Sequence, residues 1–350
     1  MNSKRPLIYD LSYDELESHL KAAKQPSYRV QQIWNGIYKE LIASPYEITT
    51  LPKDLRATLD DQFDFQSFDP VKEIMSRDKL TVKTLFKLPD SQFIEAVLMN
   101  YDQRHTLCIS SQSGCGMGCS FCATGQMGFK RNLSSGEIIA QVIHYARTLA
   151  KQDQRVTNIV MMGMGEPFHN YDPVMAALNR LNHPDAFGLG ARRFTISTVG
   201  LVPKIKQFAD EGTQYNLAIS LHTVDDELRS KMIPVNKKYP VDQIIDACGY
   251  YIQKTNRRIT FEYAVIKGVN DSLQDAKALA NKIKDLICHV NLIPLNPTPG
   301  YERQPASINQ VDSFRSILES YHIPCSIRVR RGIEIQAGCG QLAVDYQASE

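Results

Sequence analysis

The chain has 350 residues, of which 43% are hydrophobic and 22% are charged, and its formal net charge is +2. This composition is ordinary for a folded globular protein and allows one large α/β domain with a smaller appendage. The small net charge excludes a global electrostatic attraction to nucleic acid, so any such surface must be local. The sequence shows no run near the ~18 apolar residues of a membrane helix and no secretory signal. We therefore expect a cytoplasmic protein without a membrane partner.

Residues 1–66 predict a small helical domain. Ser12 and Glu15 are spaced as a capping box, apolar residues recur at helical intervals over 27–42, and Pro52 stands where a third helix would begin. We expect Trp34 and Tyr38 to lie in the core of this domain.

Residues 67–100 change from helical periodicity to alternation. The runs LTVKTLFKL (80–88) and FIEAVLMN (93–100) are separated by the turn sequence PDSQ. Two alternating runs joined in this way predict a β-hairpin. We treat the hairpin as an extension that links the helical domain to the rest of the chain.

From residue 101 onward, short β-branched runs alternate with helical stretches. Strands are predicted at 106–111, 158–163, 194–199, 216–222, 259–266, 289–296 and 325–330. Helices are predicted to begin near Ser134, Asp172, Leu201, Asp225, Val241, Ser272 and Ser307. The alternation predicts right-handed βαβ units and a parallel sheet. Six or seven units are too few for a closed eight-unit barrel, so we predict a partial, laterally open (β/α)6 barrel over 101–335, with its chemistry at the carboxyl ends of the strands.

A glycine-rich loop directly after the first of these strands carries Cys115, Cys119 and Cys122 in the spacing C-x3-C-x2-C. A structural zinc site takes four ligands, whereas a [4Fe–4S] cluster can use three thiolates and leave its fourth iron open to another ligand. We favour the cluster. Zinc completed by Cys108 or a distant cysteine is the alternative.

Polar or small residues also stand at the ends of several other predicted strands. They are Gly165, Glu166, Ser197, Ser220, Leu221, His222 and Asn296. Each signal alone is weak, because a Gly-Glu pair is often a turn and a lone histidine is often a core residue. Since carboxyl ends of parallel strands meet at one edge of a sheet, the residues together predict a ligand pocket.

Several segments of the chain, taken together, resemble the RlmN/Cfr family of radical S-adenosylmethionine (SAM) methyltransferases, which modify C2 or C8 of adenosine in RNA. These are LCISSQSGCGMGCSFCATGQMGFKRNL, NIVMMGMGEP, FTISTVGLVP, NLAISLHTVDDELR, FEYAVIKGVNDS, CHVNLIPLNP and GCGQLA, and the resemblance runs from about Gln31 to Gly340. It implies a radical SAM barrel with a [4Fe–4S] cluster on the three clustered cysteines. It also implies that SAM is bound by the strand-end residues named above.

The resemblance assigns roles to three further residues. Cys339 matches the cysteine that carries the methyl group as S-methylcysteine, Cys108 the thiol that forms a transient disulfide with it, and Glu95 the proton acceptor. By spacing alone, Cys108 would be a buried small hydrophobe and Glu95 a solvated strand residue. The family usually has DIDAACGQL around the carrier cysteine, and this chain has EIQAGCGQL, with altered residues at 334, 336 and 338.

The resemblance also implies the substrates. Two SAM molecules would be used to methylate C2 of adenosine in 23S rRNA and of the tRNA adenosine 3′ of the anticodon. A C8 methyltransferase of 23S rRNA that confers antibiotic resistance is the alternative. The implied partners are these RNAs and an electron donor such as flavodoxin or ferredoxin, and we expect a monomer. Residues 1–66 would form an RNA-binding accessory domain, and 336–350 the carrier-cysteine loop.

Local basic clusters fit an RNA substrate. They are Arg328, Arg330 and Arg331; Arg192 and Arg193; and Arg257 and Arg258. We expect all three clusters to lie near the active rim and to contact phosphates. Two other classes stay open from the residues: a radical SAM enzyme acting on a protein or metabolite, and a zinc-binding RNA adaptor without catalysis.

Overall fold

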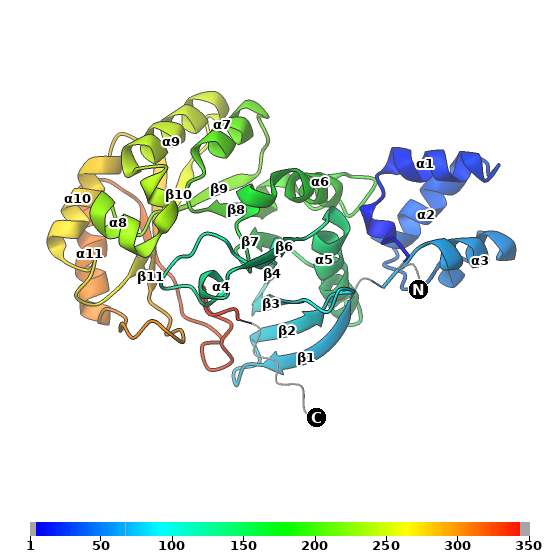
Figure 1. The fold of residues 1–350 in the computed structure, drawn as a ribbon, viewed down its shortest axis with the longest axis horizontal. Helices are drawn as coiled ribbons and strands as arrows, with labels where there is room; N and C mark the ends of the chain where they lie inside the picture. Colours follow the sequence, from blue (N-terminus) through cyan, green and yellow to red (C-terminus); the bar gives the residue numbers. More distant parts are fainter. Residues whose placement is uncertain (1–4, 67, 344–350) are drawn as a thin grey trace.

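The computed structural model describes residues 5–66 and 68–343. Residues 1–4, 67 and 344–350, which belong to the predicted helical domain, hairpin and carrier-cysteine loop, lie outside the described residues. Figure 1 shows the N-terminal helices at one end of the molecule, a long curved sheet through its middle, and further helices on the outer side of that sheet. Among the described residues, no helix has both the length and the apolar character needed to span a membrane.

The N-terminal helices are α1 (Tyr13–Ala22), α2 (Tyr28–Tyr38) and α3 (Lys53–Gln62). The predicted capping box is present, because the Ser12 hydroxyl accepts from the Glu15 backbone N–H and the Glu15 carboxylate accepts from the Ser12 N–H. Trp34 and Tyr38 are buried with ring centres 4.8 Å apart. The predicted core of this part is thus confirmed.

The hairpin is part of a larger sheet. Strands β2 (Thr81–Lys87) and β3 (Phe93–Tyr101) pair antiparallel as predicted, and β1 (Asp69–Met75) and β4 (Arg104–Cys108) extend the antiparallel ladder on either side. Strand β1 was not predicted, since its sequence DPVKEIM begins with residues that are depleted in strands. Because β4 is also the first strand of the barrel, the hairpin continues the barrel sheet.

From β4 onward the sheet is parallel. Its strands are β7 (Asn158–Met161), β8 (Phe194–Thr198), β9 (Asn216–Ser220), β10 (Ile259–Val265), β11 (Cys288–Pro294) and β12 (Cys325–Ile327). The complete order is β1-β2-β3-β4-β7-β8-β9-β10-β11-β12. Within the described chain β1 and β12 are the two edges of this sheet, which is therefore open, as predicted.

The helices between these strands begin within one residue of the predicted positions. They are α5 (Ser135–Ala150), α6 (Tyr171–Asn182), α7 (Val202–Asp210), α8 (Asp226–Met232), α9 (Val241–Thr255), α10 (Leu273–Ile283) and α11 (Ile308–Ser320). Side chains of Ser134, Asp225, Ser272 and Ser307 cap their helices. The local cap sequences therefore identified where these helices start.

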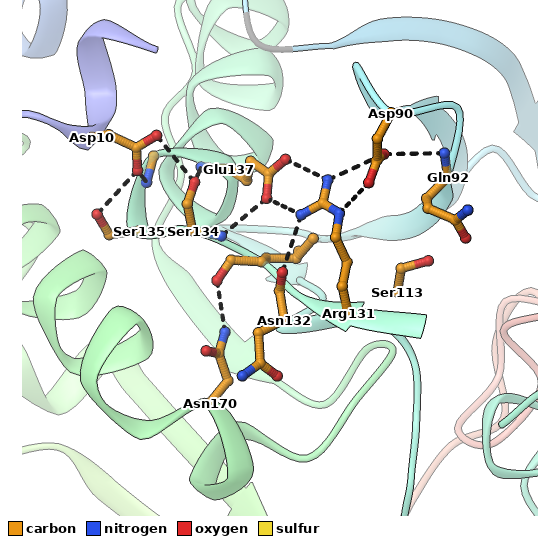
Figure 2. Close-up of polar contacts among 12 residues, drawn as sticks. Asp10, Asp90, Gln92, Ser113, Arg131, Asn132, Ser134, Ser135, Glu137 and Asn170 are labelled. Carbon is orange, nitrogen blue, oxygen red and sulfur yellow. Dashed lines mark hydrogen bonds and ion pairs between the residues drawn. The ribbon is translucent and has the colours of Figure 1, made fainter. Parts of the chain in front are cut away.

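Polar contacts join the N-terminal segment, the hairpin turn and the barrel at the start of α5 (Figure 2). The Asp10 carboxylate accepts from the backbone N–H of Gly136 at 2.6 Å. The Arg131 guanidinium makes two 2.7 Å hydrogen bonds to Glu137 and also pairs with Asp90 in the hairpin turn. These bonds fix the hairpin against the barrel, next to the cysteine loop.

Candidate active site

A cavity of about 160 Å³ lies at the carboxyl ends of the parallel strands. All three clustered cysteines and Cys339 line it, together with the predicted pocket residues Gly165, Glu166, Ser197, Ser220, His222 and Asn296. Leu221 is fully buried behind the wall and does not line the cavity. All residues of the predicted pocket except Leu221 therefore line one cavity, as the argument from strand ends predicted.

The cysteine loop is held between two short strands that the sequence did not reveal, β5 (Gln112–Gly114) and β6 (Phe129–Asn132), and it contains the one-turn helix α4 (Ala123–Gln126). The Phe121 ring packs edge-on against the His222 ring with centres 4.9 Å apart. Phe121 thus forms one side of the cavity.

The donor chemistry of the loop fits an iron–sulfur cluster. Burial raises the pKa of Cys115 to about 12 and also raises the pKa values of Cys119 and Cys122, so the metal-free thiols are protonated and would release protons when iron binds. In the described part of the chain, no three His, Cys, Asp or Glu side chains are grouped to hold one metal ion. The three thiols of the loop line one cavity, and each could bind its own iron of a [4Fe–4S] cluster.

Glu166 joins two strand ends. Its carboxylate oxygens accept from the backbone N–H groups of Phe168, at 3.0 Å, and Val199, at 2.9 Å. Burial raises the Glu166 pKa to about 7. Nearby, Gly165 has φ of +101°, and a Cβ there would lie 2.6 Å from the Gln112 side chain, so only glycine fits at this position.

His222 is a neutral hydrogen-bond donor toward the cavity. Its Nδ1 accepts from the backbone N–H of Ala264 at 2.9 Å, so in the neutral ring the proton is on Nε2. Burial lowers the His222 pKa to about 3, so the ring stays neutral at physiological pH.

The remaining predicted pocket residues present hydroxyl and amide groups. The Ser197 and Ser220 hydroxyls are 3.2 Å apart. Asn296 donates through Nδ2 to the Cys339 carbonyl oxygen at 3.1 Å, while its buried Oδ1 has no hydrogen-bond partner among the described residues. An unfilled buried acceptor suits a ligand that carries N–H or O–H groups.

Two residues of this site were missed from the sequence. Arg229 is fully buried, and its guanidinium donates to the carbonyl oxygens of Val199, Ser220 and Leu221, which ties the ends of β8 and β9 together. Glu262 on β10 lines the cavity, and burial raises its pKa. Two features of the sequence could have indicated them. Arg229 follows the strand-end His222, and Glu262 is the single carboxylate inside the apolar strand β10.

Cys339 lies in the wall between the main cavity and a smaller pocket of about 30 Å³ that Cys108 also lines. The Cys108 pKa is raised to about 12, mainly by burial and to a smaller extent by the charge of Cys339. All eight cysteines belong to the described chain, and all are free. The predicted Cys108–Cys339 disulfide is thus not present in this structure, in which Cys108 ends strand β4 and Cys339 lies in a loop.

The altered residue Gly338 has a structural role before Cys339. The Gln341 side chain accepts from the Gly338 N–H at 3.0 Å and donates to the Pro297 carbonyl at 2.8 Å. A Cβ on Gly338 would lie 2.7 Å from amide atoms of both Asn296 and Gln341. The glycine therefore lets two side-chain amides close over the loop.

Glu95 is on β3 and lines a neighbouring pocket of about 230 Å³ rather than the main cavity. Its carboxylate is 2.9 Å from the Lys83 ammonium, and both side chains are almost completely buried. Lys83 pairs in register with Val97, and Val97 with Cys108, so these side chains share one face of the sheet. The segment that leads to Cys339 covers this pocket through residues 334–336.

The three predicted basic clusters do not lie together. Arg328, Arg330 and Arg331 line the smaller pocket beside Cys108 and Cys339. The pairs at 192–193 and 257–258 directly precede β8 and β10. Because these strands are parallel, their amino ends are at the opposite edge of the sheet from the cavity. The expectation that all three clusters border the active rim was wrong.

Comparisons with known proteins agree with this geometry. The Radical SAM superfamily model matches residues 109–280. The probable dual-specificity RNA methyltransferases RlmN of Halalkalibacterium halodurans and Chloroflexus aurantiacus are 45% and 46% identical; the matches cover 99% and 96% of this chain and 95% and 92% of the relatives. A crystal structure of a radical SAM methyltransferase from Sphaerobacter thermophilus is 47% identical with a TM-score of 0.94, over 96% of this chain and 99% of that one.

These similarities extend over nearly the whole chain, so they include the cysteine loop, the hairpin and the N-terminal helices together. They confirm the predicted fold class and the predicted methyltransferase activity. The chain therefore belongs to the RlmN family of radical SAM RNA methyltransferases.

Proposed function

We propose that this enzyme methylates C2 of adenosine in 23S rRNA and of the tRNA adenosine 3′ of the anticodon, with consumption of two SAM molecules. The observation that carries the proposal is the position of Cys339, whose residue borders both the cavity of the cysteine loop and the pocket of Cys108. A methyl carrier must face the SAM site and the RNA in turn, and Cys339 stands between them.

The cofactors are a [4Fe–4S] cluster on Cys115, Cys119 and Cys122, and SAM. The SAM contacts would come from Gly165, Glu166, Ser197, Ser220, His222 and Asn296, while the predicted contact from Leu221 is dropped because this residue does not line the cavity. Glu166 would accept from the SAM ammonium, Asn296 Oδ1 from another ligand N–H or O–H, and His222 would donate through Nε2. When bound, the cluster and SAM supply the one-electron chemistry that removes a hydrogen atom from an unactivated carbon. A flavodoxin or ferredoxin would supply the electron.

Three steps fall to the chain's own residues. The Cys339 sulfur loses its proton and takes a methyl group by displacement. After that carbon has lost a hydrogen atom and bonded to adenine C2, the adduct must lose one electron, which returns to the one-electron redox system, and one proton, which Glu95 accepts. The Cys108 sulfur then bonds to the Cys339 sulfur and the carbon–sulfur bond breaks with its electron pair on carbon, which takes a proton as the product methyl group. The resulting disulfide must be reduced by two electrons before the next turnover.

The helical domain over 1–66 is proposed as an RNA-binding accessory to the radical SAM core over 101–335. A groove of about 660 Å³ runs between α1, α2 and α6, and Tyr13, Trp34, Arg180 and His183 are among its lining residues. Aromatic and cationic side chains together suit single-stranded RNA. We propose a monomer as the active form.

The test uses anaerobically reconstituted enzyme with SAM, a reductant and a transcript of the peptidyl-transferase region of 23S rRNA, followed by nucleoside mass spectrometry. We expect 2-methyladenosine, absent when Cys339→Ala replaces the enzyme. Formation of 8-methyladenosine would contradict the proposed position on the base. SAM cleavage without a methylated nucleoside would contradict the RNA substrate.

A further inference from the structure

Tyr101, the last residue of β3, lies between arginines from two distant parts of the chain. The Arg104 guanidinium carbon is 4.2 Å from the centre of the Tyr101 ring, and that of Arg331 is 4.6 Å from it. Arg104 faces Tyr101 across the tight turn between β3 and β4, whereas Arg331 comes from the segment before Cys339. Both distances are within the range of cation–π contacts. We call these three residues the Tyr101 platform.

The platform borders the smaller pocket. Tyr101 and Arg331 line it together with Cys108 and Cys339, the two thiols proposed to react. The Tyr101 ring is half-buried, and Arg104 is exposed. A group held on this platform is thus next to the carrier sulfur and is accessible from solvent.

The charge around the platform is unbalanced. Arg104, Arg328, Arg330 and Arg331 form no ion pair with a carboxylate within 4.0 Å among the described residues. Glu262 interacts with Arg328, and Asp78 with Arg331, only from beyond that distance. Four cations with an aromatic ring among them favour an anionic ligand that also has a flat face, and a nucleotide has both properties.

We propose that the Tyr101 platform binds the nucleotide next to the target adenosine, with its base stacked on the tyrosine–arginine planes and its phosphate paired with the arginines. This inference rests on the proposed function, because it takes the RNA as substrate. An adenine that enters the pocket must leave its stack. When the target adenine leaves the stack, the flanking base loses a stacking partner. The platform gives the flanking base a new surface to stack on and holds the RNA strand beside Cys339.

The test compares Tyr101→Ala with Tyr101→Phe, which keeps the ring, and Arg331→Ala with Arg331→Lys, which keeps the charge without the plane. Arg192→Ala, at the opposite edge of the sheet, is the matched control. We expect Tyr101→Ala to lower kcat/KM for RNA about tenfold through KM, and Tyr101→Phe to restore most of it. Arg331→Ala should reduce the slope of log affinity against log salt by about 1, and Arg331→Lys should keep that slope.

The RNA partner is identified with substrates that carry an abasic site 5′ or 3′ of the target. At one of these positions, the abasic RNA should lower kcat/KM of the wild-type enzyme as much as the Tyr101→Ala substitution does with intact RNA. The same abasic RNA should not lower kcat/KM of the Tyr101→Ala variant any further. Additive losses at both positions, or an unchanged kcat/KM for Tyr101→Ala, would overturn the proposal.

A binding measurement separates this inference from the proposed function. RNA with 2-aminopurine at the flanking position should lose fluorescence when it binds cluster-loaded wild-type enzyme and should keep more of it with Tyr101→Ala. This holds even if no methylated nucleoside forms. Equal quenching by both proteins would reject the platform, whereas quenching without methylation would reject only the proposed reaction. Iron content and thermal unfolding of each variant verify that it is folded and loaded.

Discussion

Two walls of the active site are built in different ways. The first wall consists of the cysteine loop and the ends of β7, β8 and β9, and each of its residues lies at the end of a strand or in the loop that follows it. The second wall combines the hairpin with the segment before and after Cys339. It is closed by contacts between residues more than 200 positions apart, such as the bond from the Arg77 backbone N–H to the Glu334 carboxylate.

The difference separates two tasks. The first wall has a local origin and provides thiols, hydroxyls and amides that suit a small cofactor. The second wall provides a thiol pair, a buried carboxylate with its ammonium, and arginines, which suit a reaction on RNA. We therefore expect changes in the first wall to remove cofactor binding, and changes in the second wall to leave cofactor binding in place while they impair the reaction on RNA.

The sharpest test of this division compares Cys119→Ala with Cys339→Ala. Both should abolish RNA methylation, but Cys119→Ala removes a proposed cluster ligand and should lose most bound iron, whereas Cys339→Ala should keep it. Iron and sulfide analysis with absorbance spectra measures this. Cys325→Ser, at a half-buried strand residue outside both pockets, is the control. Equal iron loss in the Cys339 variant would show that the walls do not act separately.

The second test changes the buried pair on the hairpin. Lys83→Met removes the ammonium 2.9 Å from the Glu95 carboxylate, and a buried carboxylate without that charge favours its protonated form. We expect RNA turnover to fall on the order of a hundredfold, because a proton acceptor contributes about that much or more, while iron content is unchanged. A covalent enzyme–RNA adduct should accumulate, visible as a shifted band on a denaturing gel.

Glu95→Gln should accumulate the same adduct, and Lys83→Arg should largely restore turnover. Breaking a buried ion pair can cost about 3–5 kcal/mol of stability, so thermal unfolding of each variant must accompany the assay. If Lys83→Met is folded and turns over normally, Lys83 has no part in proton removal.

The third test measures how the free energy of unfolding depends on pH, through Glu166 in the first wall. Burial raises the Glu166 pKa to about 7, so the folded protein binds a proton that the unfolded chain, with a value near 4.5, has released. The free energy of unfolding should therefore fall as pH rises from about 4.5 to about 7 and level off above 7. Relative to Glu166→Gln, the change should approach about 3 kcal/mol, measured by denaturant unfolding. A difference between the two proteins that is independent of pH would contradict the raised pKa.

Most of the first wall could be predicted from the sequence. Local alternation and the caps of the following helices indicate where strands end, as at Ser197 and Ser220. Because the carboxyl ends of parallel strands meet at one edge of a sheet, these residues could be expected to lie together. Arg229 escaped prediction because its role, bonding three backbone carbonyls, depends on which carbonyls the fold leaves without partners. Strands β5 and β6 were missed because three- and four-residue pairs give no periodic signal.

The second wall was predictable only through resemblance. Nothing local shows that Lys83 is the partner of Glu95, since that depends on the hairpin register. The convergence of Tyr101 with Arg331 depends on a chain segment 230 positions away. The two misplaced basic clusters are a different kind of error. Both directly precede strands, so the rule that places the chemistry at the carboxyl ends of the strands already put them at the opposite edge of the sheet.

The smallest expected effect concerns Gly338→Ala, which restores the residue usual in the family. Its new Cβ would press on amide ends of Asn296 and Gln341, which are flexible and can shift, and alanine also reduces the freedom of the unfolded loop. The opposing effects should keep the rate of Cys339 methylation within about threefold of wild type, measured by protein mass spectrometry. Asn296→Ala, which removes the bond to the Cys339 carbonyl, should slow it more. A large loss with Gly338→Ala alone would mean that the two amides cannot move, so the second wall would be as rigid as the first.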